Sequence, residues 1–199
     1  MHTRIAFLGA PLLTLAYGVI RILDGLDGQR GPGLAWTAGH LVFIGAMALF
    51  IVAFAQMRQG AGRNMLSTVL AVLGSIGAVA LSIQFGIDII AGALTHDALS
   101  MSIKTAELRE ASHTALLAYD VGPYLFYVSQ VAIVAQLAVM RRIKAWTPFL
   151  VLIDMIMPFV DKDLIPVGAV VLLISFASIS QRLSEGSCSP EPVMSPRAS

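Results

Sequence analysis

The sequence predicts an all-α fold: a polytopic membrane helix bundle of about six transmembrane helices, with both termini cytoplasmic. Of the 199 residues, 57% are hydrophobic and 13% are charged, whereas soluble domains carry about 25% charged residues. A helix that crosses a bilayer needs about 20 mostly apolar residues. Six apolar runs approach that length: residues 5–23, 34–56, 66–90, 116–140, 146–160 and 165–179. We therefore expect one bundle over residues 1–182, followed by a disordered cytoplasmic tail over 183–199.

The charges between the apolar runs predict the orientation of the bundle. The loops after the first, third and fifth runs are rich in Asp and Glu. The remaining short loops are basic and contain Arg58, Arg63, Arg141, Arg142 and Lys144. Short loops rich in Lys and Arg stay in the cytoplasm. The pattern therefore predicts a multi-pass protein of the cell membrane with its N- and C-termini inside and its acidic loops outside.

The first two runs carry polar residues near their outer ends. In the first run, Tyr17 lies one turn before Arg21, which we expect to pair with Asp24 at the membrane surface. In the second run, Trp36 and His40 lie one turn apart. Trp36 is typical of the aromatic belt at a membrane interface. For His40, a structural hydrogen bond and a role in proton transfer or substrate contact remain equal alternatives, because its imidazole titrates near neutral pH.

The third run is rich in small residues, and Gly74 and Ala78 form a small-xxx-small pair that favours close helix packing. Such a face allows a second copy of the chain as a partner, so a homodimer is one expected arrangement. Gln84 and Asp88 lie one turn apart near the outer end. They can bond each other or hold a common ligand. Residues 96–113 then read as an amphipathic surface helix, or alternatively as a lid over the bundle.

The fourth run combines polar side chains with a helix breaker. One helical stripe contains His113, Asp120, Tyr124 and Tyr127. Pro123 follows a glycine, so we expect a kink near Asp120.

The last two runs are short, and they either span the membrane or form a re-entrant pair. Asp154 lies about 10 Å below the outer end of the fifth run, and Pro158 after it favours a helix that lines a cavity. Asp161 and Asp163 are expected to be ordinary loop charges, one of them neutralised by Lys162.

Ionisable residues within these runs predict a shared site. A charge in hydrocarbon costs on the order of 3 kcal/mol, so such groups normally face protein or water. Four of them fall at a similar depth on four runs, and these are the candidate catalytic residues: His40, Asp88, Asp120 and Asp154. The candidate substrate-binding residues are Tyr17, Trp36, Gln84, Tyr124 and Tyr127. We expect them to meet in one polar pocket in the outer half of the bundle.

Several functions fit such a pocket. A buried aspartic acid can serve as a general acid that starts the cyclisation of an isoprenoid, with aromatic faces stabilising the cations. Asp120 and Asp154 are the candidate acids, with Asp88 or His40 as partner or terminal base. A proton-coupled carrier or exporter, or a non-catalytic accessory protein, are the alternatives. Besides the lipid bilayer, the expected partner is a hydrophobic small molecule. Metal, cofactor and nucleic acid are not expected, because there are four histidines, one cysteine and no basic cluster beyond the topology signal.

In size and in carrying acids within apolar segments, the chain resembles the small integral-membrane terpene cyclases. The resemblance implies an isomerase or lyase of isoprenoid biosynthesis within a helical bundle. It is architectural and covers no diagnostic motif, and those proteins commonly have seven spans where six are counted here. No catalytic residue is therefore transferred from that family.

Overall fold

The structure is a computed structural model that describes residues 2–26, 28 and 30–186. Within these residues it contains eight α-helices, one short 3-10 helix and no strand. The helices are α1 (His2–Asp24), α2 (Leu34–Gly60), α3 (Met65–Ala93), α4 (Ala98–Glu110), α5 (His113–Asp120), α6 (Gly122–Val139), α7 (Thr147–Val160) and α8 (Ile165–Gly186), with the 3-10 turn η1 (Lys162–Leu164) between the last two. The predicted all-α fold is confirmed.

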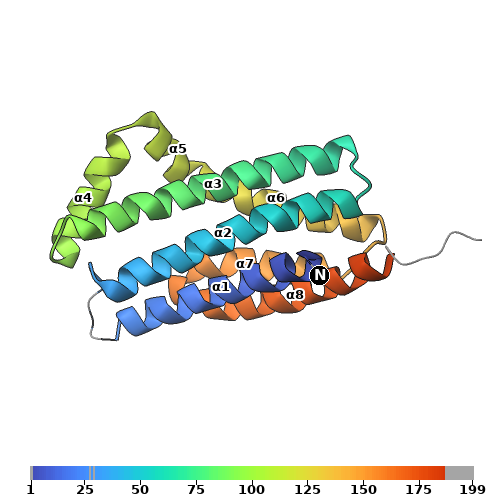
Figure 1. Cartoon of the computed structure of the whole chain (residues 1–199), viewed down its shortest axis with the longest axis horizontal. Coiled ribbons are helices and arrows are strands. Elements are labelled where there is room, and N and C mark those ends of the chain that lie inside the picture. The colour runs from blue at the N-terminus through green and yellow to red at the C-terminus, as the bar shows by residue number, and fades with distance from the viewer. Residues whose placement is uncertain (1, 27, 29, 187–199) are drawn as a thin grey trace, which may run out of the picture.

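The long helices pack into a closed ring. Along this ring α1 contacts α2, α2 contacts α3, α3 contacts α6, α6 contacts α7, and α7 contacts α8, which returns to α1. The short helices α4 and α5 lie outside the ring against α3 (Figure 1). The connections α1–α2, α3–α4 and α7–α8, which carry the acidic residues, meet at one end of the bundle (Figure 1). The basic α2–α3 and α6–α7 connections lie at the opposite end.

The length and composition of the helices suggest a membrane protein. Within the described residues, five segments are long and apolar enough to cross a bilayer: Arg4–Asp24, Leu34–Gly60, Met65–Ala93, Gly122–Val139 and Lys162–Ser184. α7 has 14 residues and is therefore about 21 Å long, less than the roughly 30 Å hydrocarbon core. α8 is longer than expected and continues past residue 182 to Gly186. The rest of the predicted tail lies outside the described residues.

The fourth apolar run is broken where the sequence predicts a kink. α5 ends at Asp120 and α6 begins at Gly122, with Val121 between them and Pro123 in the first turn of α6. Proline fits the first turn of a helix because the backbone N–H that it lacks has no partner there. The run therefore forms two helices, and its N-terminal part does not continue the helical stripe of its C-terminal part.

Phenylalanines fill the core of the bundle. Phe7, Phe54, Phe126 and Phe176 are fully buried. Phe50 packs edge-on against Phe126 and Phe176, with ring centroids 5.0 and 5.8 Å apart. These rings come from α1, α2, α6 and α8, and they hold the ring of helices together.

Glycines let α3 and α6 approach closely. A Cβ at Gly77 would lie 2.8 Å from the Cα of Phe126, and a Cβ at Gly122 would lie 2.6 Å from the Cβ of Ala80. Gly74 faces the ring of Phe54 on α2. The small-residue stripe of the third run is therefore used within this chain, between neighbouring helices.

This packing gives the first prediction. Gly77→Ala should lower the free energy of unfolding by roughly 1–3 kcal/mol, because the new methyl group meets the rigid backbone of α6. Gly86→Ala on the same helix is the control, since its Cβ would meet nothing within 4 Å and alanine favours a helix interior. Thermal unfolding in detergent measures both variants. Equal midpoints for the two would contradict the tight α3–α6 contact.

Candidate functional site

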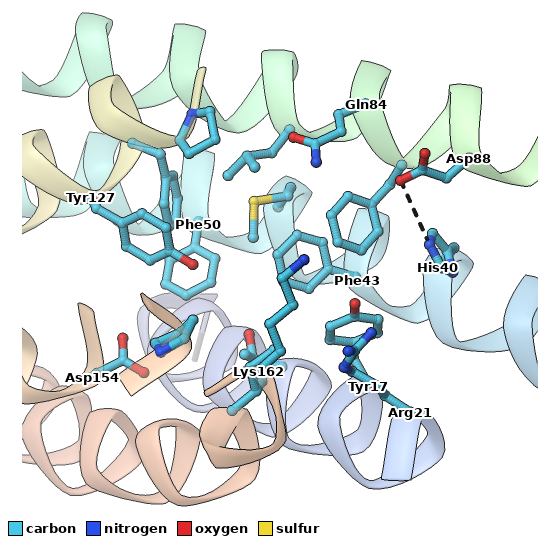
Figure 2. Close-up of a pocket in the computed structure, with 18 of the residues that line it drawn as sticks. Tyr17, Arg21, His40, Phe43, Phe50, Gln84, Asp88, Tyr127, Asp154 and Lys162 are labelled. Atoms are coloured by element: carbon cyan, nitrogen blue, oxygen red, sulfur yellow. Dashed lines mark ion pairs between the residues drawn. The ribbon is translucent and has the colours of Figure 1, made fainter. Parts of the chain in front are cut away.

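A cavity of about 300 Å³ lies inside the ring of helices, in the half nearer the acidic connections (Figure 2). α1, α2, α3, α6, α7, η1 and α8 all contribute lining residues. Its apolar wall contains Phe43, Met47, Phe50, Leu81, Phe85 and Phe126. This volume is at the lower end of the range for small-molecule sites. The aromatic core closes the cavity toward the opposite half of the bundle.

Seven of the nine predicted site residues line this cavity: Tyr17, Trp36, His40, Gln84, Asp88, Tyr127 and Asp154. They come from five helices that are distant in sequence. These seven residues therefore lie around one shared cavity, as the sequence led us to expect. What they do there is a separate question.

Asp120 and Tyr124 lie outside the cavity, so for these two residues the predicted placement is wrong. The Asp120 side chain is about half exposed and pairs with Arg109 on α4. Tyr124 is 61% exposed and stacks on Phe159. Asp120 lies outside the cavity because the chain breaks at Val121. This break turns α5 away from the face of α6 on which Tyr127 reaches the cavity.

One side of the cavity is built around His40, whose Nδ1 lies 2.7 Å from the carbonyl oxygen of Trp36. A carbonyl can only accept, so Nδ1 carries the proton in the neutral ring and Nε2 keeps its lone pair. Nε2 lies 3.9 Å from Oδ2 of Asp88 (Figure 2). The imidazole is 5% exposed, and the Trp36 ring packs over it with centroids 4.1 Å apart.

Tyr119 completes this cluster, although the sequence analysis did not single it out. Its hydroxyl donates to Oδ1 of Asp88 at 2.5 Å. The indole N–H of Trp36 donates to the backbone carbonyl of Asp88 at 3.2 Å. Trp36 thus bonds within the bundle and lines the cavity. The cluster ties α2, α3 and α5 together.

Asp154 occupies the other side of the cavity and is 7% exposed. Among the described residues, none forms a hydrogen bond or an ion pair with its carboxyl group. Gly168 on α8 leaves room for that group, since a Cβ there would lie 2.9 Å from Oδ1. Pro158, one turn later on α7, has no N–H to donate to the carbonyl of Asp154. The carboxyl is therefore buried, closely packed and free to contact a ligand.

Two cations, Arg21 and Lys162, also line the cavity. Sequence reasoning assigned both to the surface. The Nε atom of Arg21 lies 3.7 Å from Oδ1 of Asp163. Both carboxylate oxygens of Asp163 lie 2.7 Å from Nη2 of Arg30. Within the described residues Lys162 forms no ion pair, so the expectation that it neutralises a neighbouring aspartate is wrong. Figure 2 shows its side chain extending into the cavity.

Comparison of this chain with protein-family models, with curated proteins and with solved structures gives no match. Among the described residues, no three His, Cys, Asp or Glu side chains lie close enough to hold a metal ion. The site itself offers two carboxyl groups, one oriented imidazole, two cations and an aromatic wall.

The Tyr119–Asp88 contact gives the second prediction. Tyr119→Phe removes the donor to a half-buried carboxyl group and should lower the free energy of unfolding by roughly 1–3 kcal/mol. Tyr124→Phe is the matched control, because its exposed hydroxyl forms no hydrogen bond with the described residues. Thermal unfolding in the same detergent compares the two. Loss of stability in both variants, or in neither, would contradict the contact.

Proposed function

We propose that this cavity binds a hydrophobic small molecule and catalyses the acid-initiated cyclisation of a linear isoprenoid. One observation carries the proposal: the buried, unpaired carboxyl of Asp154 and the imidazole of His40 line the same apolar, aromatic cavity on opposite sides (Figure 2). A proton donor and a proton acceptor separated by an apolar space are the groups that such a reaction needs at its beginning and end.

Asp154 is the proposed general acid. It donates its proton to the less substituted carbon of the terminal double bond, so that a C–H bond forms, the π bond is lost and a tertiary cation results at the other carbon. The electrons of the next double bond attack this cation, which closes the ring and moves the positive charge along the chain. A carboxyl group must carry its proton to begin this step, and apolar surroundings disfavour the charged form of any carboxyl.

The cavity wall suits the cationic intermediates. The rings of Phe43 and Phe85 stack with centroids 4.1 Å apart, and Tyr17 packs against both. On the other side lie Phe50 and Tyr127. The π-faces of aromatic rings attract cations, and the apolar wall limits water that would otherwise trap the cation too early.

His40 is the proposed terminal base. Its Nε2 accepts a proton from the carbon next to the final cation, and the electrons of that C–H bond form the new double bond. The product is an isomer of the substrate, so no cofactor is consumed. Solvent exchange returns the proton to Asp154. The Trp36 carbonyl orients the imidazole for this role by fixing its tautomer.

We also propose that the bundle spans the cell membrane six times with both termini in the cytoplasm. The separation of acidic and basic connections at the two ends of the bundle supports this orientation. α7 would be a short span, accommodated by tilt or by local thinning of the bilayer. The cavity would then lie in the outer half of the membrane.

Asp154→Asn gives the third prediction. The variant should fold normally and lose turnover by about 10²–10⁴-fold, because the amide cannot donate the initiating proton. The assay incubates purified protein with linear geranyl and farnesyl alcohols and detects cyclised isomers by mass spectrometry. In heavy water, the product should gain one deuterium at the carbon that was protonated.

Asp120→Asn is the matched control for this assay. Asp120 lies outside the cavity in an exposed ion pair, so its replacement should leave turnover unchanged and cost less than about 1 kcal/mol of stability. Full activity of Asp154→Asn, or the absence of any cyclised product with the wild-type protein, would sink the proposal.

His40→Asn gives the fourth prediction. The asparagine amide can still donate to the Trp36 carbonyl but offers no basic nitrogen. We expect substrate consumption to continue while the products shift from cyclic alkenes to cyclic alcohols, since water then traps the final cation. Chromatographic product ratios measure this shift. An unchanged ratio would remove His40 from the mechanism.

A proton-coupled carrier is a second candidate function, favoured by one observation. Gln130 on α6 is 1% exposed, and neither atom of its amide has a hydrogen-bond partner among the described residues. It lies about one turn beyond Tyr127, away from the acidic end of the bundle. A polar group there extends the line of polar side chains deeper than the cavity. Proton-coupled uptake in vesicles that stops in Gln130→Leu would favour the carrier.

A further inference from the structure

The charges at the mouth of the cavity point to the chemical class of its ligand. We propose that the ligand is a single-chain amphiphile whose anionic head group, a phosphate or a carboxylate, binds between Arg21 and Lys162. This inference rests on the proposed function in so far as both assign the ligand to the same cavity. It adds a recognition site that the cyclisation mechanism does not require.

Arg21 is the first part of this site. Its side chain is 17% exposed, and its buried Nε has no hydrogen-bond partner among the described residues. Its ion pair with Asp163 is long, at 3.7 Å, because Arg30 takes both oxygens of that carboxylate at 2.7 Å. The side chain also hydrogen-bonds Tyr17, but its Nε donor stays unused, and a buried donor without a partner is costly.

Lys162 is the second part. It comes from η1, which packs against α1, and its side chain extends into the cavity beside Tyr17 and Arg21 (Figure 2). No described residue forms an ion pair with it. Asp88 attracts Lys162 electrostatically without forming an ion pair with it, and Asp154 forms no ion pair within the described chain. Two cations therefore face one apolar space.

An anion between these cations would complete the polar contacts that the chain leaves open. A phosphate or a carboxylate accepts several charge-assisted hydrogen bonds at once, and arginine matches their planar geometry. Tail-first protonation by Asp154 leaves the head group on the molecule throughout the reaction. The head group can therefore anchor the chain while its tail lies along the aromatic wall.

The test compares four probes with the same chain and different head groups: geranyl phosphate, geranic acid, geraniol and geranylamine. Binding to the full-length protein in detergent is measured by isothermal titration at low and high salt. We expect at least one of the two acids to bind about tenfold tighter than geraniol, with the advantage reduced at high salt. The stronger of the two acids identifies the anion as phosphate or carboxylate.

Lys162→Met and Arg21→Met should each remove most of this advantage and leave geraniol affinity within twofold. Lys104→Met is the matched control, because Lys104 pairs with Glu107 on α4, outside the cavity. Lys162 is exposed, so its replacement keeps the test valid even where Arg21→Met impairs folding. Acid affinities unchanged by Lys162→Met, or tighter binding of geranylamine, overturn the proposal.

The same experiment separates the two proposals. Equal binding of acid and alcohol with intact turnover overturns the head-group site alone. Tight, Lys162-dependent binding of an acid, together with product formation by Asp154→Asn, overturns the cyclisation mechanism and leaves the head-group site standing. Failure of every probe to bind would overturn both.

Discussion

The need to satisfy polar groups inside an apolar bundle is the constraint on which this structure depends. Little water is available within a bilayer, so each buried donor or acceptor must find a partner in the protein. Trp36 and Tyr119 meet that need by donating to Asp88 from α2 and α5, and His40 bonds the Trp36 carbonyl within α2. Their contacts hold the short α5 against the ring of helices. Without them, three polar side chains would face hydrocarbon, and the acidic end of the bundle would lose its side wall.

Tight packing in one part of the bundle makes room in another. Gly77 and Gly122 bring α3 and α6 to backbone contact, and phenylalanines fill the core between the helices. Toward the acidic connections, large side chains line the cavity without filling it. Gly168 adds the complementary detail, because its missing side chain accommodates the carboxyl of Asp154. The cavity is therefore a consequence of where small and large residues lie along the helices.

Sequence periodicity could predict the helices and the depth of the ionisable residues, because both follow local rules. It could not predict how the break at Val121 orients α5. Apolar runs located six of the eight helices, and the depth of ionisable residues located His40, Asp88 and Asp154 at the cavity. The proline after Val121 indicated a kink, but its direction depends on the packing of α5 on α3. That direction decides which of two adjacent residues faces the bundle: Tyr119 contacts Asp88, whereas Asp120 pairs with Arg109 outside the cavity. Arg21 and Lys162 were missed because nearby aspartates offered them simpler local partners.

The short length of α7 explains how a lysine from a connection reaches the cavity. α7 ends at Val160, about two turns beyond Asp154. A span of normal length would carry the following residues farther outward, above the mouth. Because α7 stops early, η1 lies level with Arg21, and Asp163 meets Arg21 and Arg30 there. That contact fixes the turn against α1, and Lys162, next to Asp163 in the chain, is directed inward. The feature that makes α7 a poor span by length is therefore the feature that places a cation at the mouth of the cavity.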